Sequence, residues 1–323
     1  MSDANLPLTH LPTRILVTGS SGYLGAALVA RLRRDGLQVV GVDPLPAATT
    51  AVVGSICDRA LIAEVLRRHE IQAIVHTAAL HKPHIALHPE AAFAAVNVEG
   101  TRNLLAAAVA PGSSVDRFVF TSTTSLMISA EIRAGRAGGA RRAAWIDEDF
   151  APLRPRNIYG VTKLAAERLC HECHAEHGLP IVILRTSRFF PEADDMAHTI
   201  VQSDANTKTN EYLFRRVSRE DVAESHVVAL ARAPALGQGT FLVSAPTPFV
   251  AADCEELIVD APAVVARYYP HYRELYARRG WTMFASIDRV YVSTRAARVL
   301  GFTPRIDFAA RLAALAAGDE AEP

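Results

Sequence analysis

The sequence predicts an α/β protein with a doubly wound parallel sheet of the Rossmann type and a smaller C-terminal lobe that binds substrate. Three observations lead to this prediction. Short apolar runs alternate with helical segments, a glycine-rich turn follows the first apolar run, and the alternation becomes irregular from Pro191 onward. In open sheets of this kind the ligand lies beyond the carboxyl ends of the strands, so a lobe packed there would cover it.

The expected strands are short and rich in aliphatic and β-branched residues, as strands buried on both faces are. They comprise residues 14–18, 38–43, 73–76, 117–120 and 180–185. The expected helices have amphipathic or alanine-rich composition and comprise residues 26–32, 60–69, 91–108 and 159–177. Because each helix lies between two strands, the connections are crossovers, and the sheet should be parallel.

We expect two structural units in this chain. The nucleotide-binding domain should comprise residues 1–185 and 217–245, and the substrate lobe residues 186–216 and 246–323. The aromatic segment 261–284 has the composition of such a lobe. The segment 134–144 is rich in glycine and arginine and predicts an exposed loop, with a lid or a partner contact as the alternative.

Composition excludes several classes of protein. The 323 residues include 34 basic and 34 acidic side chains, so the formal net charge is zero, and half of the residues are hydrophobic. This balance argues against a disordered chain and against a nucleic-acid partner. Four cysteines make no disulfide framework, and no apolar run reaches the ~18 residues of a membrane span. We therefore expect a cytoplasmic protein without a membrane partner and without a signal peptide.

A glycine triplet marks the first candidate site. Gly19, Gly22 and Gly25 follow a predicted strand and open a predicted helix. In a dinucleotide-binding turn, such glycines permit the tight turn, the approach of a pyrophosphate and close helix–strand packing. The helix N-terminus adds free N–H groups and a positive dipole end. A plain structural turn is the alternative.

Asp43 strengthens the prediction of a dinucleotide site. It ends the second predicted strand, 18 residues beyond Gly25, where a carboxylate can accept hydrogen bonds from both ribose hydroxyls. A 2′-phosphate at this position would face a like charge, so the sequence favours NAD over NADP. A solvated aspartate in the turn before Pro44 is the alternative.

Tyr159 and Lys163 form a candidate acid–base pair. Their i, i+4 spacing places them on one face of the predicted helix. We expect the ammonium group, with the positive nicotinamide of an oxidised cofactor, to lower the pKa of the phenol from about 10. Tyr159 could then remove a proton from a substrate hydroxyl while hydride leaves for the cofactor.

A run of hydroxyl residues follows the strand at 117–120. Residues 121–125 read Thr-Ser-Thr-Thr-Ser and should lie at the carboxyl edge of the sheet, where one hydroxyl could orient a substrate oxygen. A loop with local side-chain to backbone hydrogen bonds is the alternative.

Together these motifs resemble the extended short-chain dehydrogenase/reductase superfamily, and within it the NAD-dependent epimerase/dehydratase family. The resemblance covers most of residues 14–230 and rests on the ordered set TGSSGYLG (18–25), Asp43, HTAA (76–79), NVEGT (97–101), TSTTS (121–125) and YGVTK (159–163). Weaker similarity extends over residues 286–308. No single motif is as specific as this order.

The resemblance implies roles for individual residues. Tyr159 would be the base, Lys163 would bind the nicotinamide ribose, and Thr123 would be the catalytic hydroxyl, with Ser122 and Thr124 as alternatives. Asn97 would give structural support. The cofactor would contact Gly19, Ser21, Gly22, Tyr23, Leu24, Gly25, Asp43, Ser55, Ile56, Ala78, Ala79 and Lys163. A homodimer formed through residues 91–108 and 159–177 is also implied.

Departures from the family pattern limit the choice of activity. Ser55 stands where relatives often place an adenine-binding aspartate, and Asp58 is displaced from that position. Thr124 and Ser125 replace the acidic pair of sugar 4,6-dehydratases, which disfavours dehydration. Arg188 replaces an asparagine near the diphosphate in sugar-nucleotide members, and could instead clamp a phosphate or a carboxylate.

Other candidate residues have weaker signals. His81 or Lys82 could contact substrate just beyond a strand end, and Arg289 and Arg295 lie where relatives often bind phosphate. Cysteines and histidines between 170 and 177 have metal-ligand types. They share one helix, however, which cannot wrap around an ion, so we expect no metal site.

The sequence leaves three functions open. The first is a UDP-hexose-type nucleotide-sugar 4-epimerase that retains NAD and uses Tyr159 as acid and base. The second is an NAD(P)-dependent dehydrogenase or reductase of a small hydroxy or keto compound, which Arg188 favours. The third is a catalytically silent NAD-binding scaffold or sensor, which the presence of Thr123, Tyr159 and Lys163 argues against.

Overall fold

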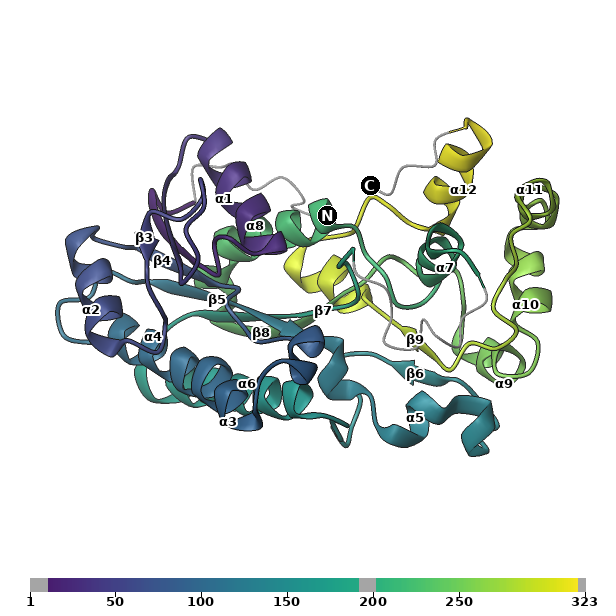
Figure 1. The fold of residues 1–323 in the computed structure, drawn as a ribbon, viewed down its shortest axis with the longest axis horizontal. Coiled ribbons are helices and arrows are strands. Elements are labelled where there is room, and N and C mark those ends of the chain that lie inside the picture. Colours follow the sequence, from purple (N-terminus) through teal and green to yellow (C-terminus); the bar gives the residue numbers. More distant parts are fainter. Residues whose placement is uncertain (1–10, 192–201, 319–323) are drawn as a thin grey trace.

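The computed structural model describes residues 11–191 and 202–318. Its centre is a seven-stranded sheet whose neighbouring strands all run parallel, in the order β3-β2-β1-β4-β5-β7-β8 (Figure 1). This order confirms the predicted doubly wound sheet of the Rossmann type. The strands are β1 (Arg14–Thr18), β2 (Gln38–Asp43), β3 (Val52–Val53), β4 (Ala73–His76), β5 (Arg117–Thr123), β7 (Ile181–Thr186) and β8 (Gln238–Val243).

Helices cover both faces of the sheet (Figure 1). On one face lie α1 (Tyr23–Arg34) and α8 (Arg219–Leu236), and on the other α2 (Arg59–Arg68), α4 (Gly100–Ala108) and α6 (Ile158–His177). Within β1, Ile15 and Val17 join the first hydrophobic cluster, whereas Leu16 joins the second. Successive side chains of a strand point to opposite faces, so this alternation buries both faces of the sheet.

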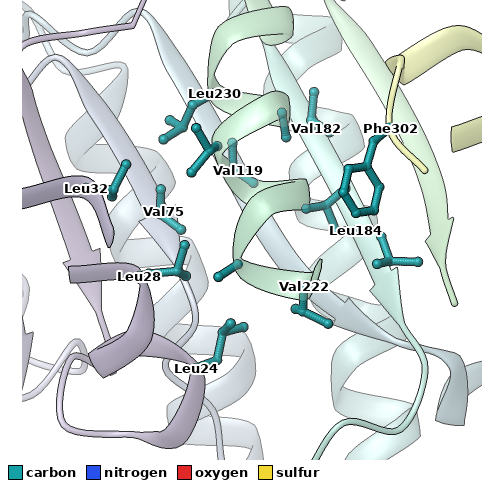
Figure 2. Packing of buried hydrophobic residues seen from close by; sticks show 14 of the residues in the cluster. Leu24, Leu28, Leu32, Val75, Val119, Val182, Leu184, Val222, Leu230 and Phe302 are labelled. Atoms are coloured by element: carbon teal, nitrogen blue, oxygen red, sulfur yellow. The ribbon is translucent and has the colours of Figure 1, made fainter. Parts of the chain in front are cut away.

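The first cluster shows how the two helices are held on the sheet. In Figure 2, Leu24, Leu28 and Leu32 of α1 pack with Val222 and Leu230 of α8 on the same face of the sheet, over strand residues such as Val75 and Val119. Each fully buried leucine contributes about 1.5–3 kcal/mol relative to an exposed one. This packing fixes the first turn of α1, and with it the position of the glycine-rich segment.

The structure differs from the sequence prediction in a few elements. The predicted helix 91–108 is divided into α3 (Glu90–Phe93), a π-helical turn η3 (Ala94–Glu99) and α4. Strand β5 continues to Thr123 because it pairs with β7 along its whole end. Strands β3 and β8 were not predicted from the sequence, because they are short or weakly apolar strands at the sheet edges.

The second lobe has its own core. It contains a two-stranded parallel sheet of β6 (Ala144–Ile146) and β9 (Arg289–Tyr291), around which aromatic residues such as Tyr272 and Tyr276 are buried. Its helices are α5 (Ala130–Ala134), α7 (Asp204–Glu211), α9 (Cys254–Leu257), α10 (Ala261–Tyr268), α11 (Tyr272–Arg279) and α12 (Phe308–Ala316). In residues 11–191 and 202–318, no helix combines the length and the apolar character that crossing a membrane requires. The boundaries proposed from the sequence remain a prediction, although β6, which they assign to the nucleotide-binding domain, pairs with β9 of this lobe.

The expectation of an exposed loop at 134–144 is confirmed for most of the segment but not for Gly135 and Ala143. Gly135 and Ala143 are buried, while the arginines between them are exposed. The amide of Ala143 donates to the carbonyl of Cys254 at 2.7 Å, and the amide of Ala144 donates to the carbonyl of Asp288 at 2.9 Å. These hydrogen bonds attach the segment to distant parts of the second lobe. Local sequence patterns cannot predict such contacts, because the partners lie far apart along the chain.

A buried histidine predicts how fold stability depends on pH. The ring of His226 on α8 lies between the carbonyl of Val222 and the hydroxyl of Thr121, each at 2.7 Å. Burial lowers the pKa of His226 to about 4. Between that value and the ordinary pKa of about 6.5, the unfolded chain binds more protons, so stability must fall as the pH drops.

We therefore expect His226 alone to cost about 2 kcal/mol of unfolding free energy between pH 7 and pH 5. Denaturant unfolding of the wild type and of His226→Gln at both pH values measures this term. The variant should be less stable at pH 7 but lose less on acidification. The matched control is His177→Gln, which changes an exposed histidine. An equal pH dependence in wild type and His226→Gln would contradict the assignment.

Candidate functional site

A cavity of about 970 Å³ follows the carboxyl ends of the central strands. The segments after β1, β2, β4, β5 and β7 line it, and Arg289 and Tyr291 of β9 contribute from the second lobe. The cavity thus lies where the sequence analysis expected the ligand site of an open α/β sheet.

The glycine turn forms one end of the cavity. Gly19 has a φ of +72°, and a Cβ atom there would lie 2.7 Å from the amide nitrogen of Ala78. A Cβ atom at Gly25 would lie 2.0 Å from the carbonyl oxygen of Gly19. Helix α1 then starts at Tyr23, with Gly22 as an N-cap that has no side-chain hydrogen bond. The turn therefore fits a pyrophosphate, which needs close backbone approach and helix N–H groups.

Asp43 lies at the end of β2 with a fixed carboxylate. One oxygen accepts from the amide of Ser21 at 3.1 Å and the other from the amide of Leu45 at 2.9 Å. Each oxygen keeps a lone pair for a ribose hydroxyl. Ser55 and Ile56 line the same cavity, whereas Asp58 caps α2 by accepting from the amide of Leu61. The residues present at this end fit an adenosine ribose.

The acid–base candidates converge on one place. Asn157 caps α6 by accepting from the amide of Gly160 at 3.0 Å, so Tyr159 and Lys163 lie in its first two turns. The Lys163 ammonium lies 3.9 Å from the centre of the Phe120 ring. Thr123 lies at the end of β5, and all three residues line the cavity.

The pKa expected for Tyr159 needs correction. Burial raises the pKa of Tyr159 to about 12, and the polar side chain of Thr123 opposes this shift. Burial lowers the pKa of Lys163 to about 7, while Cys170 and Glu167 act to raise it. In the protein itself, removal of both groups from water therefore outweighs the effect expected from the lysine.

The cofactor-contact and hydroxyl candidates have different surroundings. Ala78, Ala79 and Thr124 line the cavity, as do Ser21, Tyr23 and Leu24 of the glycine turn. Ser122 also borders the cavity, but its hydroxyl donates to Glu167 at 2.6 Å on the side of α6. Asn97 lies in η3 and donates to the hydroxyl of Thr162 at 3.0 Å. Substrate binding by Ser122 and Thr124 remains a prediction.

The candidate substrate residues His81, Arg188 and Arg289 line the same cavity. The ring of His81 stacks on Phe190 with centroids 4.8 Å apart. Arg188 lies 3.3 Å from the buried carboxylate of Glu211, and Arg289 donates to Asp288. Arg295 instead pairs with Asp149 and does not belong to the cavity lining.

Sequence reasoning missed several residues of this lining. Phe189 and Phe190 follow Arg188 directly, and their position in the loop after a strand was the available signal. Arg133, Arg156 and Arg215 have no common motif and reach the cavity from three distant segments. Their convergence depends on how the second lobe packs on the sheet.

The cysteines and histidines of α6 have structural surroundings. Cys170 and Cys173 pack in the second hydrophobic cluster, and Nδ1 of His174 lies 2.8 Å from the carbonyl oxygen of Leu179. Among the described residues, no three histidine, cysteine, aspartate or glutamate side chains are arranged to hold a metal ion.

The glycine turn, Asp43 and the Tyr159–Lys163 pair on this sheet are the features of the extended short-chain dehydrogenase/reductase superfamily. Residues 15–237 match the model of the NAD dependent epimerase/dehydratase family. The chain belongs to this family.

Individual relatives carry several names. The chain is 33% identical over 186 residues to a UDP-glucose 4-epimerase of Azospirillum brasilense, covering 55% of this chain and 49% of that one. A 3-beta-hydroxysteroid dehydrogenase of Mycolicibacterium neoaurum is 30% identical over 257 residues, which are 71% of this chain and 65% of that one. The chain therefore spans about half the length of the first relative.

A solved structure resembles the whole chain. It is a short-chain dehydrogenase/reductase superfamily protein from Agrobacterium tumefaciens with bound NAD. The identity is 25% and the TM-score 0.63, with 94% of this chain and 96% of that chain covered.

The glycine turn gives a direct binding prediction. In Gly25→Ala the new methyl group meets the Gly19 carbonyl, so the turn must move and the affinity for NAD should fall at least about tenfold. Titration calorimetry of protein freed of nucleotide measures this change. Gly36→Asn is the control, because a side chain there meets no atom within 4 Å and asparagine tolerates positive φ. Unchanged affinity in Gly25→Ala would contradict the proposed pyrophosphate site.

Proposed function

We propose that this protein is a nucleotide-sugar 4-epimerase of the UDP-hexose type that keeps NAD bound through the reaction. The observation that carries the proposal is the position of Tyr159. It lies one turn from Lys163 on α6, in the cavity that also contains Thr123, the glycine turn and Asp43. The family and the name of the Azospirillum relative support the same function.

The cofactor end of the cavity suits NAD. The backbone at Gly19, Gly22 and Gly25 would hold the pyrophosphate against the start of α1. Asp43 would accept from the ribose hydroxyls, and its negative charge opposes the 2′-phosphate of NADP. When bound, NAD supplies the nicotinamide ring that takes up hydride from a sugar carbon and returns it.

The protein's own groups then move and hold the proton. Tyr159 removes the proton of the sugar 4-hydroxyl and later gives it back, while the Thr123 hydroxyl orients the same oxygen. Because burial raises the pKa of Tyr159 to about 12, its phenolate needs a positive charge nearby. Lys163 provides this charge only as an ammonium, so its protonation state matters for activity.

The substrate end suits a diphosphate. Arg188, Arg215 and Arg289 line the cavity there, and a guanidinium can bind phosphate oxygens through two parallel N–H groups. His81 and Phe190 add a stacked pair of flat rings to the same cavity. These residues support a phosphorylated substrate with a planar or sugar portion.

A second function is a net NAD-dependent dehydrogenase of a small hydroxy compound. Arg188 in place of the asparagine expected for sugar-nucleotide members favours it, as does the name of the Mycolicibacterium relative. A silent NAD-binding scaffold has less support, because Thr123, Tyr159 and Lys163 lie together in the cavity.

An assay without added NAD tests the proposal. We expect the protein to interconvert UDP-glucose and UDP-galactose, and chromatography of the two sugars measures this reaction. Tyr159→Phe should lower kcat about a hundredfold or more, because the substitution removes the group that acts as acid and base. Tyr269→Phe, on a residue outside the cavity lining, is the control.

Two results would contradict this account. Turnover of Tyr159→Phe within a few-fold of wild type would remove Tyr159 from its role. A wild type that leaves both sugars unchanged, yet reduces added NAD with small alcohols, would favour the dehydrogenase.

A further inference from the structure

Behind the cavity lies a buried network that the proposed reaction does not use directly. Glu167 of α6 accepts from the Ser122 hydroxyl at 2.6 Å. Its two oxygens also accept from Arg185, through Nε at 3.0 Å and Nη2 at 2.8 Å. All three side chains are buried, and neither Glu167 nor Arg185 belongs to the cavity lining.

The network joins the elements that carry the acid–base residues. Ser122 precedes Thr123 on β5, and Arg185 lies opposite Ser122 in the register of β5 and β7. Glu167 lies one helical turn after Lys163 on α6. A buried carboxylate is costly unless it is paired and hydrogen-bonded, so the three side chains hold one another in this arrangement.

The same carboxylate contributes negative charge near Lys163. The titratable groups that act on this lysine are Glu167 and Cys170 of α6 and His76 of β4, while Arg185 of β7 acts through its pairing with Glu167. Burial keeps His76 and the Cys170 thiol neutral near pH 7, since it lowers the pKa of the first and raises that of the second. Of these groups, Glu167 therefore supplies the negative charge.

We propose that Ser122, Glu167 and Arg185 form a positioning network that fixes the end of β5 at Thr123 against α6, and that the Glu167 carboxylate, one helical turn from Lys163, favours the ammonium form of this lysine. Ser122 is then a positioning residue rather than a substrate ligand. The catalytic consequence rests on the proposed function, because it requires Lys163 as an ammonium beside Tyr159. The charge of Lys163 itself does not depend on which substrate the enzyme takes.

The sequence permits a direct test, because the chain has three lysines, Lys82, Lys163 and Lys208. NMR of protein labelled with ¹³C in lysine gives three side-chain signals, and Lys163→Met identifies the signal of interest. In the wild type this signal should titrate near pH 7, where burial places the pKa of Lys163. The measurement uses the full chain and requires no turnover.

Two variants should move this titration in opposite directions. Glu167→Gln keeps the shape but removes the negative charge, so the midpoint should fall by about one pH unit. Arg185→Met removes the positive charge that is paired with Glu167, so the carboxylate acts more strongly on Lys163 and the midpoint should rise by a similar amount. General disruption of the fold would not produce opposite shifts, and either variant decides the question if the other does not fold.

The control is Glu148→Gln. Glu148 is also a buried carboxylate, accepts from the amide of Leu242 at 2.9 Å and does not belong to the cavity lining, so the Lys163 titration should stay unchanged. Midpoints of the Glu167 and Arg185 variants that match wild type, or that shift in the same direction, would overturn the proposal. If the midpoints shift as expected in a protein without epimerase activity, the network stands and the proposed function fails.

Discussion

The structure depends on the burial of both faces of one parallel sheet. Residues of each strand alternate between two hydrophobic clusters, as Ile15 and Leu16 of β1 do, so helices must cover both sides. Polar groups then have one favourable place, the edge where the strands end and the chain turns toward a helix. The glycine turn, Asp43 and Thr123 all lie at such strand ends.

This arrangement also sets the electrostatics of the site. Tyr159 and Lys163 lie on the face of α6 that packs against the sheet, so both are removed from water. Burial disfavours the charged form of each group, which raises the pKa of the phenol and lowers that of the ammonium. The site therefore needs another charge to favour the ammonium form of Lys163. In the network described above, the buried carboxylate of Glu167 supplies this charge.

Much of this could be predicted from the sequence, because the signals are local. The apolar runs locate β1, β2 and β4 with the bounds that the structure has, and the i, i+4 spacing places Tyr159 and Lys163 on one helix. What the sequence did not predict depends on contacts between distant segments. The pairing of β6 with β9 and the bond of Ser122 to Glu167 are examples. The pKa of Tyr159 belongs here too, since burial is a property of the packed fold.

The central claim is that this chain holds NAD as a resident group and recycles it. The most direct measurement is to denature the purified protein and quantify the nucleotide that it releases. The account predicts about one NAD per chain and little NADP, because Asp43 fixes the ribose end and the glycine turn the pyrophosphate. A purified protein that releases no nucleotide and binds NAD only reversibly would contradict a recycled cofactor, and one that does not bind NAD would refute the site itself.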